Sequence, residues 1–376
     1  MRLLLTGGGT GGHIYPALAI AEALGEDHEF EPFDVLFVGN RGGLEARIVP
    51  GAGLRAAFIH SAPLERKLSF ALLRTLVANA AGFFEAFGVL HRFRPDVAIS
   101  TGGYVTFPLL AALRLVRAFG RSRARIALLE PNATRGLTNR LLEPLADEIW
   151  LTVSAPGRAL GKREVVTGTP VRASFLQPMP ARAARASLGL AADATTIVVF
   201  GGSQGARSLN EAVTGLGSEG LPPEWQVLLV SGERDFAAIS ARLRAAAHPE
   251  RLHAIAYLED PRAAYAAADL IVARAGASTL GELAATGTPA LLVPYPYATA
   301  DHQAHNAEAA RATGAARVIA DRELNPARLR AELTAALEPD AYAALRRSAQ
   351  ALATNDPRAA IVARVKRWSQ EKTSSR

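Results

Sequence analysis

The sequence predicts an α/β protein with two domains, each built on a parallel β-sheet. Its 376 residues, 49% of them hydrophobic, are enough to form two ordinary cores. Short β-rich runs alternate with helical stretches along the whole chain, which is typical of parallel strands joined by crossover helices. A proline-rich segment at 168–180 separates two series of strands and predicts an interdomain linker. We therefore expect two Rossmann-like halves.

The expected strands are short apolar runs bounded by turn residues. They are Leu3–Leu5, Val35–Val38, Val97–Ser100, Ile126–Leu129 and Ile149–Val153 in the first series, and Ile197–Phe200, Gln226–Val230, Leu270–Ala273 and Ala290–Val293 in the second. A last, basic helix is expected at about residues 358–368, where apolar residues recur at helical spacing. We place the two domains at 1–170 and 171–352, followed by a C-terminal segment at 353–376.

Composition restricts the compartment and the chemistry. The chain has no cysteine, which excludes disulfides, thiolate metal sites and cysteine nucleophiles and favours a reducing compartment. The apolar run Leu3–Leu5 leads directly into glycines and is too short for a signal peptide. The apolar stretch at 68–90 is interrupted by Arg74, Asn79 and Glu85, so it is a poor candidate for a membrane span. We expect a cytoplasmic protein with no transmembrane segment.

Positive charge is concentrated in the first half and the tail. The net charge is +7, and residues 60–125 hold ten Lys or Arg against three Asp or Glu. A nucleic-acid-binding protein would explain the pI of about 10.0, but the sequence has no recognition helix, zinc-ligand spacing or RNA-stacking motif. We therefore expect no nucleic-acid partner. At 64–90, Arg66, Lys67 and Arg74 interleave with Leu and Phe, which suits either docking at a membrane surface or a core helix with a solvated basic edge.

Each half has a glycine-rich turn between a strand and a helix. The first is Gly7–Gly12, followed by His13 and by Pro16, which suits a first helical turn; the second is Gly201–Ala206. Glycine lets backbone N–H groups approach a ligand at a helix N-terminus, so both turns suit a phosphate or a developing oxyanion. Such turns are also glycine-rich for packing alone, but two at matching positions favour ligand binding.

Several motifs for nucleotide and metal binding are missing. Neither glycine turn ends in the Lys-Ser/Thr of a P-loop, and Val38 is followed by Gly39-Asn40-Arg41 instead of the acidic residue of a dinucleotide fingerprint. The sequence has no Asp-x-Asp, the usual carboxylate clamp for a divalent ion between phosphates. We predict no metal and no cofactor. A leaving pyrophosphate would then be neutralised by helix dipoles and basic side chains.

A third candidate site lies in the second half, where Arg274–Glu282 follows the expected strand Leu270–Ala273. The Glu282 carboxylate suits the two hydroxyls of a ribose, because it accepts two hydrogen bonds. Thr279-x-x-Glu282 also matches a helix capping box, and both alternatives stay open. After the next expected strand, a polar loop ends at Gln303, which offers a donor and an acceptor to sugar hydroxyls.

Six motifs, in order, carry a resemblance to a known family. They are Gly7-Gly8-Gly9-Thr10-Gly11-Gly12-His13-Ile14-Tyr15-Pro16-Ala17, Gly102-Gly103-Tyr104-Val105, Gly168-Thr169-Pro170-Val171-Arg172, Gly201-Gly202-Ser203-Gln204-Gly205-Ala206, Arg274-Ala275-Gly276-Ala277-Ser278-Thr279 and Asp301-His302-Gln303. Together they closely resemble the bacterial UDP-N-acetylglucosamine:undecaprenyl-pyrophosphoryl-muramoyl-pentapeptide N-acetylglucosaminyltransferases, over nearly the whole chain.

The resemblance implies the GT-B glycosyltransferase architecture, two Rossmann-like domains facing a cleft. The lipid acceptor would bind the N-terminal domain, to which the final helix returns, and the nucleotide-sugar mainly the C-terminal one. The implied UDP-GlcNAc site assigns Ser203 and the following amides to the diphosphate with Arg172 nearby, Glu282 to the ribose, the region of Leu258 to the uracil and Gln303 to the GlcNAc hydroxyls. It also includes Ala277, Ser278 and Thr279, while Thr10, Gly11, Gly12 and Asn132 would line the acceptor and sugar side. The family commonly has His-Glu-Gln-Asn where this chain has Leu129-Glu130-Pro131-Asn132, so Asn132 is preserved, while Leu129 and Pro131 replace the family's His and Gln.

The implied reaction is transfer of GlcNAc from UDP-GlcNAc to the C4 hydroxyl of undecaprenyl-pyrophosphoryl-MurNAc-pentapeptide, with inversion, in peptidoglycan synthesis. An inverting displacement needs a base on the acceptor side. His13 is our candidate, because a helix N-terminus lowers the pKa of histidine and favours its neutral form; alternatively it orients the acceptor or caps the helix.

Two other activities remain as alternatives: another UDP-sugar-dependent glycolipid glycosyltransferase, and a UDP-GlcNAc 2-epimerase. An enzyme that acts on a polyprenyl-linked sugar must meet the anionic inner leaflet of the cell membrane. For such an enzyme we favour peripheral docking through 64–90, on the cytoplasmic side, over the core-helix interpretation.

Overall fold

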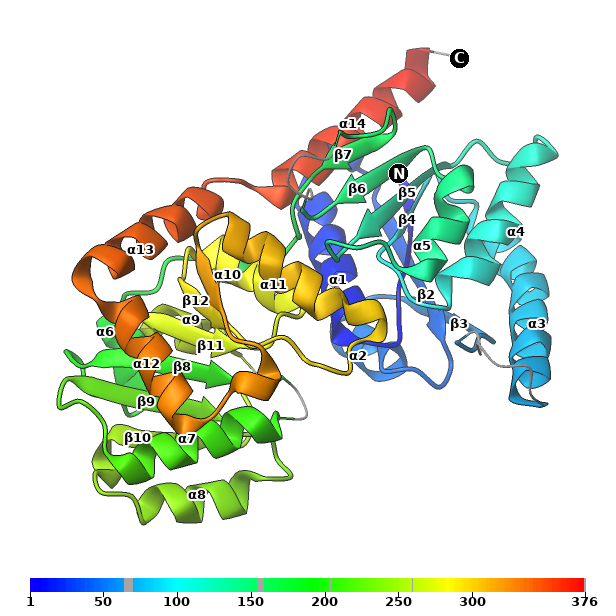
Figure 1. The fold of residues 1–376 in the computed structure, drawn as a ribbon. Coiled ribbons are helices and arrows are strands. Elements are labelled where there is room, and N and C mark those ends of the chain that lie inside the picture. Colours follow the sequence, from blue (N-terminus) through cyan, green and yellow to red (C-terminus); the bar gives the residue numbers. More distant parts are fainter. Residues whose placement is uncertain (64–69, 154–158, 203–204, 259, 375–376) are drawn as a thin grey trace. The chain divides into compact units, whose positions relative to one another are not determined.

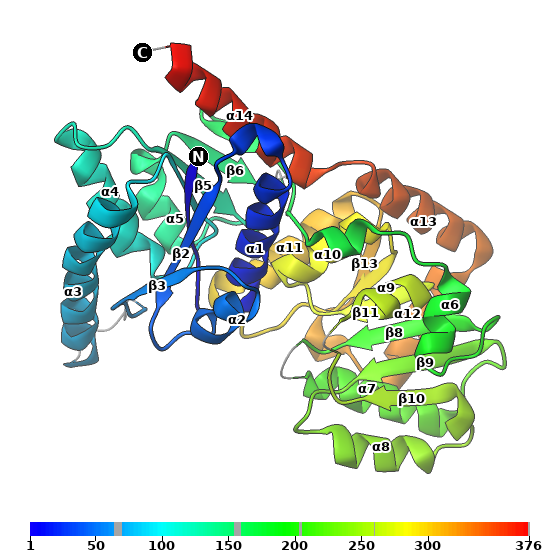
Figure 2. The ribbon, with the colours of Figure 1, turned by 180° about the vertical axis from the view of Figure 1, so that it is seen from behind.

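The computed structural model describes residues 1–376 except 64–69, 154–158, 203–204, 259 and 375–376 (Figure 1). The chain divides into two compact units: unit 1 consists of Met1–Ala173 and Asp356–Arg376, and unit 2 consists of Ser174–Asn355. Each unit is a parallel sheet with helices on both faces (Figures 1 and 2). The predicted α/β class with two parallel-sheet domains is therefore confirmed.

The sheet of unit 1 has, in the described part of the chain, seven parallel strands in the order β3-β2-β1-β4-β5-β6-β7. They are β1 (Arg2–Thr6), β2 (Asp34–Asn40), β3 (Ala56–Ile59), β4 (Val97–Ser100), β5 (Arg125–Glu130), β6 (Glu148–Leu151) and β7 (Glu164–Val166). Because side chains alternate along a strand, Leu3 and Leu5 lie in one core and Leu4 in the core on the opposite face. Burial on both faces explains why this strand is an unbroken apolar run.

The helices of unit 1 are α1 (Gly11–Gly25), α2 (Glu45–Gly51), α3 (Phe70–Phe93), α4 (Thr106–Ala118), α5 (Leu137–Leu142) and α14 (Pro357–Ser374), with the short 3-10 helices η1 (His28–Phe30) and η2 (Glu143–Leu145). Helices α1 and α14 pack in the core that contains Leu3, and α3 and α4 in the core that contains Leu4. Trp368 of α14 stacks on Trp150 of β6 with ring centroids 5.9 Å apart, and Arg358 pairs with Glu26 at the end of α1. The C-terminal helix is thus part of unit 1.

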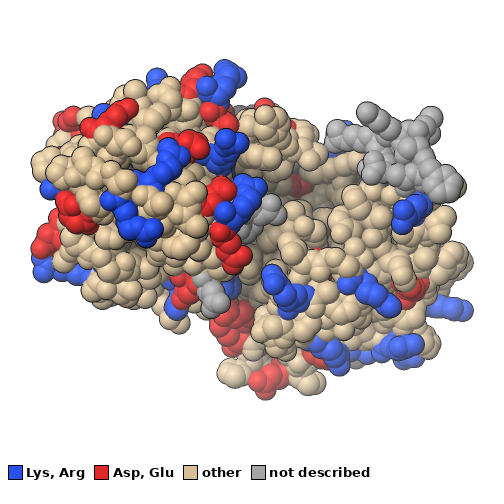
Figure 3. Space-filling model, turned by 90° about the horizontal axis from the view of Figure 1, so that it is seen from below, with Lys and Arg blue, Asp and Glu red and all other residues tan. Residues whose placement is uncertain are grey.

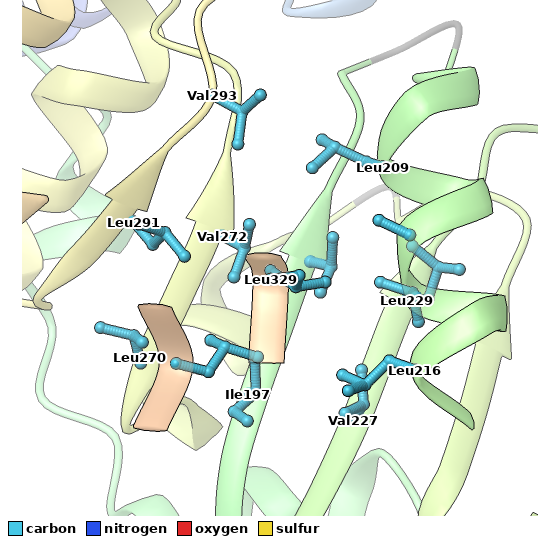
Figure 4. Packing of buried hydrophobic residues seen from close by; sticks show 14 of the residues in the cluster. Ile197, Leu209, Leu216, Val227, Leu229, Leu270, Val272, Leu291, Val293 and Leu329 are labelled. Carbon is cyan, nitrogen blue, oxygen red and sulfur yellow. The ribbon is translucent and has the colours of Figure 1, made fainter. Parts of the chain in front are cut away.

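Unit 2 has a sheet of six described strands in the order β10-β9-β8-β11-β12-β13. They are β8 (Thr195–Phe200), β9 (Trp225–Val230), β10 (Leu252–Ile255), β11 (Leu270–Ala273), β12 (Ala290–Leu292) and β13 (Ala316–Val318). Its helices are α6 (Ala181–Ser187), α7 (Arg207–Glu219), α8 (Phe236–Arg244), α9 (Arg262–Ala267), α10 (Ala277–Thr286), α11 (His302–Ala312), α12 (Pro326–Leu337) and α13 (Pro339–Ala353). Figure 4 shows one core of this unit, where Leu209 and Leu216 of α7 meet Ile197, Leu229 and Val272 of the sheet.

All the strands expected from the sequence are present. Four were not predicted: β3, β7, β10 and β13, and these are the two edges of each sheet. Edge strands are covered on fewer sides than central strands. Strands β7, β10 and β13 each contain a polar or charged residue, and β3, although apolar throughout, is mostly half-buried. In β7, for example, each residue is half-buried or exposed.

The order of the strands creates an equivalent point in both sheets. Strand β1 lies between β2 and β4, and β8 lies between β9 and β11, so the chain order reverses beside β1 and beside β8. Doubly wound sheets bind ligands at such a point, outside the carboxyl ends of the strands. The two predicted glycine turns follow β1 and β8, and so both lie at a ligand-binding position of the fold.

Candidate functional site

The glycine turn of unit 1 packs against a second glycine turn. Gly7–Thr10 connects β1 to α1, and Thr101–Tyr104 follows the neighbouring strand β4. The Gly8 N–H donates to the Gly102 carbonyl at 3.2 Å, and a Cβ atom at Gly103 would lie only 2.4 Å from the Gly8 carbonyl oxygen. Glycine is therefore required here by close backbone approach.

His13 is held by this second turn. Its Nδ1 lies 2.7 Å from the Thr101 carbonyl oxygen, and the Thr101 hydroxyl donates to the His13 carbonyl at 2.6 Å. A carbonyl oxygen only accepts, so a neutral ring bonded in this way carries its proton on Nδ1 and has its lone pair on Nε2. A Cβ atom at Gly102 would lie 2.8 Å from the ring. The imidazole is thus oriented by a hydrogen bond and by close packing.

The start of α1 has no side-chain cap. Thr10 is the N-cap residue, with extended backbone and no cap hydrogen bond from its side chain. Thr10 is exposed, and Gly11 and Gly12 are half-buried. The first N–H groups of a helix have no partner inside the helix. The predicted residues Thr10, Gly11, Gly12 and His13 thus form one continuous segment at the carboxyl end of β1.

Asn132 lies in a loop after β5 that is organised by a buried carboxylate. Glu130 is 2% exposed; it accepts from the Asn132 backbone N–H at 3.1 Å, from the Gly136 N–H at 3.0 Å and from the Asn139 side chain at 2.9 Å. Burial raises the pKa of Glu130, and these hydrogen bonds act in the opposite direction. Leu129, at the position of the family's histidine, is fully buried in the core. In this chain, position 129 therefore contributes to the core.

Arg172 belongs to unit 1, close to its end. Its guanidinium lies over the ring of Tyr15 in α1, 5.4 Å from the ring centroid. A cation above an aromatic face is a weak but orienting contact. Arg172 is therefore held beside the helix that carries His13; its predicted role at the diphosphate stays a prediction.

The second glycine turn follows β8. Ser203 and Gln204 lie outside the described residues, so the predicted contact of Ser203 stays a prediction. Around them, Gly202 and Gly205 have positive φ of 87° and 74°, and the Gly205 N–H donates to the Gly202 carbonyl at 2.9 Å. A Cβ atom at Gly205 would lie 2.2 Å from the Ser231 carbonyl oxygen. Helix α7 begins directly afterwards, and its N-cap Ala206 has no side-chain cap bond.

The Arg274 turn leads into α10, whose N-cap is Gly276. Ala277, Ser278 and Thr279 are therefore the first residues of the helix, and the capping-box interpretation is wrong, because Thr279 lies inside the helix instead of at its N-cap. The Ser278 hydroxyl is buried without a hydrogen-bond partner among the described residues. Arg274 bonds to Ser208, to the Val293 carbonyl and to Asp321, so it ties together segments that follow β8, β12 and β13.

Glu282 and Gln303 are both held by hydrogen bonds inside unit 2. The Tyr265 hydroxyl donates to Glu282 Oε2 at 2.8 Å, and the Tyr295 N–H donates to Gln303 Oε1 at 3.0 Å. Burial, and secondarily the charge of Glu282, raise the pKa of Tyr265 well above its ordinary value, so Tyr265 stays a donor. Leu258 is half-buried in the loop after β10.

Two residues important for this arrangement were not singled out by the sequence. Tyr265 stacks on Phe200 with centroids 5.4 Å apart, and the Asn306 side chain donates to the Ala275 carbonyl at 3.1 Å. Their partners are 17 or more positions away in the sequence. A local motif therefore could not reveal them.

Helix α3 presents an apolar surface on unit 1. Leu73, Val77 and Phe84 are 54%, 62% and 71% exposed and share one face, because they are four and seven positions apart. The opposite face, with Ala86, Leu90 and Phe93, is packed in the core. The segment Leu72–Phe93 is long and apolar enough to cross a membrane by length and composition, with 17% of it buried.

In the view of Figure 3, Lys and Arg side chains are scattered among acidic and uncharged residues. Arg74 of α3 is exposed, as are Arg114, Arg121 and Arg123 near the end of α4. Arg117 and Arg125 of the same region instead pair with Asp147 and Glu371. Arg66 and Lys67, and the other predicted docking residues at 64–69, lie outside the described residues.

Known proteins are similar along most of the chain. The glycosyltransferase family 28 N-terminal domain matches residues 3–151, and the family 28 C-terminal domain matches residues 196–362. Two relatives are named UDP-N-acetylglucosamine--N-acetylmuramyl-(pentapeptide) pyrophosphoryl-undecaprenol N-acetylglucosamine transferase. The one from Chlorobium luteolum is 42% identical over 338 residues, covering 87% of both chains, and the one from Desulforudis audaxviator is 39% identical over 362 residues, covering 94% of both. The crystal structure of Acinetobacter baumannii MurG is similar with a TM-score of 0.73 and 25% identity, over 96% of this chain and 98% of that one.

Two parallel-sheet units, each with a glycine turn at its switch point and each matched by a family 28 domain, define a glycosyltransferase. With relatives 39% and 42% identical over most of its length, the chain belongs to the family of UDP-N-acetylglucosamine--N-acetylmuramyl-(pentapeptide) pyrophosphoryl-undecaprenol N-acetylglucosamine transferases.

Proposed function

We propose that this chain transfers GlcNAc from UDP-GlcNAc to the C4 hydroxyl of undecaprenyl-pyrophosphoryl-MurNAc-pentapeptide, releasing UDP and inverting the anomeric centre. The names of its relatives state N-acetylglucosamine transfer with this donor and this lipid acceptor for those proteins. The observation that carries the proposal for this chain is the orientation of His13, which is fixed at the carboxyl end of β1 with its Nε2 as the acceptor nitrogen. Acceptor activation needs such a group.

On the acceptor side, His13 Nε2 would accept the proton as the C4 hydroxyl attacks the anomeric carbon. The hydrogen bond from Nδ1 to the Thr101 carbonyl stabilises the imidazolium that forms, because the carbonyl dipole faces the new charge. Thr10, Gly11, Gly12 and Asn132 would position the acceptor and the sugar, and Glu130 keeps the Asn132 loop in place.

On the donor side, unit 2 would hold UDP-GlcNAc. The turn at Gly201–Ala206 leads into the N-terminus of α7, where N–H groups and the helix dipole favour a diphosphate. In this proposal Ser203 and Arg172 contact the diphosphate, while the N-terminus of α10, with Ala277, Ser278 and Thr279, faces the nucleotide. Glu282 binds the ribose with its carboxylate oriented by Tyr265, Leu258 contacts the uracil, and Gln303 contacts the GlcNAc hydroxyls.

The experiment is transfer from labelled UDP-GlcNAc to a polyprenyl-pyrophosphoryl-MurNAc-pentapeptide, measured in EDTA. We expect a labelled disaccharide lipid and stoichiometric UDP, with retained activity in chelator, because N–H groups and basic side chains neutralise the leaving group. Turnover of UDP-GlcNAc that needs no lipid acceptor would point to an epimerase or a hydrolase. Complete dependence on magnesium would contradict the proposed donor site.

We further propose that α3 docks unit 1 on the anionic inner leaflet, which makes the protein peripheral to the cytoplasmic side of the membrane. The exposed stripe Leu73, Val77 and Phe84 would enter the interface, and Arg74 would meet lipid phosphates. This surface belongs to the unit that we assign to the lipid acceptor.

Sedimentation with vesicles containing phosphatidylglycerol tests this docking. The double variant Leu73→Ser, Phe84→Ser should bind about 10-fold more weakly or worse, since each large apolar side chain contributes roughly 1.5–3 kcal/mol when buried. The matched control is Tyr297→Ser in unit 2, an aromatic side chain that is 82% exposed. An equal loss of vesicle binding in the α3 variant and in Tyr297→Ser, or no loss in the α3 variant, would refute docking through α3.

A further inference from the structure

A buried carboxylate, Glu45, lies against the glycine turn of unit 1. Glu45 is the first residue of α2 and is fully buried. Its Oε2 accepts from the Gly9 N–H at 3.2 Å, and its Oε1 accepts from the Asn40 N–H at 3.0 Å. The side chain thus joins the turn after β1 to the end of β2.

Three glycines make room for this carboxylate. A Cβ atom at Gly8 would lie 2.3 Å from Glu45 Oε1, one at Gly43 would lie 2.4 Å from the carboxyl group, and one at Gly39 would lie 2.5 Å from Glu45 Cγ. The glycines come from the turn after β1, from β2 and from the loop before α2. Three segments are therefore shaped around one side chain.

Within the described part of the chain, backbone N–H groups are the only donors to this carboxylate, and no Lys, Arg or His pairs with it. Burying a carboxylate without a cation is costly, and a neutral side chain of the same shape would fill the space at lower cost. Costly buried groups concentrate where they hold a functional geometry. A role beyond packing is thus indicated.

The Glu45 carboxylate holds the backbone just before the segment Thr10–His13. Gly9 has a positive φ of 84°, and its N–H points to Glu45 one residue ahead of the N-cap Thr10. On its other side, Gly9 packs on Tyr104, whose hydroxyl accepts from the Asn40 side chain at 3.1 Å. Glu45 therefore fixes the Gly9 peptide from one side and the Tyr104 ring packs on the other.

We propose that Glu45 is a positioning residue for glycosyl transfer. Its carboxylate fixes the Gly9 peptide, and through it the orientation of Thr10, Gly11, Gly12 and His13 toward the acceptor. This inference rests on the proposed function, since it assigns that segment to the acceptor. The Gly9 N–H is used inside the protein, so the amides offered to a substrate begin after Gly9.

The test compares Glu45→Gln with Glu148→Gln, a matched variant of another buried carboxylate of unit 1. Glu148 is 7% exposed, bonds to Trp150 and pairs with Arg364 and Arg367. In Glu45→Gln the amide NH₂ must face one of the two N–H donors, so the turn shifts. We expect kcat to fall about 10- to 100-fold, because small misplacements of reacting groups lower the rate by this order. The KM for UDP-GlcNAc should change less than 2-fold. Glu148→Gln should keep wild-type kcat per folded molecule, measured well below the midpoint of thermal unfolding.

A second readout needs no substrate. The ¹⁵N resonances of the His13 ring, assigned by their loss in His13→Ala, should move in Glu45→Gln and stay in place in Glu148→Gln. If Glu45→Gln does not fold, Glu45→Asp replaces it: the shorter carboxylate does not reach both N–H groups, and the same two changes are expected.

The outcomes separate the inference from the function. Unmoved His13 resonances, or a kcat within 2-fold of wild type, would overturn the positioning role. Moved resonances together with a reduced kcat support it. If the wild-type chain fails to glycosylate the lipid acceptor, the proposed function is wrong, whereas moved resonances would still support the hold of Glu45 on the turn.

Discussion

The two glycine turns occupy the same position of the same fold, yet their surroundings differ. The turn after β1 is backed by the Glu45 carboxylate and is followed by an imidazole bonded to Thr101. The turn after β8 packs on the Ser231 carbonyl and is followed by Ala206 and α7, with no titratable side chain between Gly205 and the helix. A proton acceptor suits the first turn and an anion suits the second. In the proposed function, one backbone design thus serves two chemical tasks, and the residues beside it decide which.

The substitution His13→Ala gives the strongest test of the different roles proposed for the two turns. Removal of a general base should lower kcat by about 10²- to 10⁴-fold, and the KM for UDP-GlcNAc should change little, because the donor is assigned to unit 2. Steady-state transfer with labelled UDP-GlcNAc measures both. His248→Ala, which changes a half-exposed histidine of unit 2, should behave as wild type. A kcat within 10-fold of wild type for His13→Ala would leave His13 as an orienting residue only.

The second turn is tested by Gly205→Ala. Its positive φ and the 2.2 Å approach of a Cβ atom to Ser231 force the turn to move, so we expect about a 100-fold loss in kcat/KM for UDP-GlcNAc, comparable to the loss of an oxyanion donor. Gly220→Ala is the matched control, since Gly220 has a φ of 86° but open space for a Cβ atom. If Gly205→Ala and Gly220→Ala lowered kcat/KM for UDP-GlcNAc equally, the loss would come from backbone strain and not from the donor site.

The smallest effect concerns the support of Glu282. Tyr265→Phe removes the hydroxyl that donates to Glu282 Oε2, and one hydrogen bond contributes about 0.5–1.5 kcal/mol. We expect the KM for UDP-GlcNAc to rise about 2- to 10-fold with kcat unchanged. Tyr342→Phe, at a half-buried tyrosine of unit 2, should leave both constants in place. A lower kcat for Tyr265→Phe would show that this pair affects the chemical step.

The sequence predicted what depends on short segments. Central strands are buried on both faces and are visible as apolar runs, and the glycine turns are visible because close approach demands glycine in consecutive positions. The same reasoning failed at the four edge strands, whose runs are short and partly exposed. It also left the capping-box alternative at Thr279 open, and the structure rejects it because the helix begins at Ala277.

Residues that act through distant partners could not be predicted. Glu45 acts on the glycine turn through the Gly9 N–H, which lies 36 positions away in the sequence, although Asn40 is only five positions away. Tyr265 is likewise defined by its contact with Glu282, which is 17 positions away. Such residues become visible only when the fold brings their partners together.

The return of α14 to unit 1 makes unit 2 an insertion within unit 1. A Cβ atom at Gly168 would lie 2.8 Å from Pro357, so the two points where the chain leaves and re-enters unit 1 are neighbours. Excision of 174–355 with a short peptide bridge therefore preserves the continuity of unit 1. Simple truncation at 173 would instead remove Trp368 and uncover Trp150, so the N-terminal half alone is the wrong fragment to express.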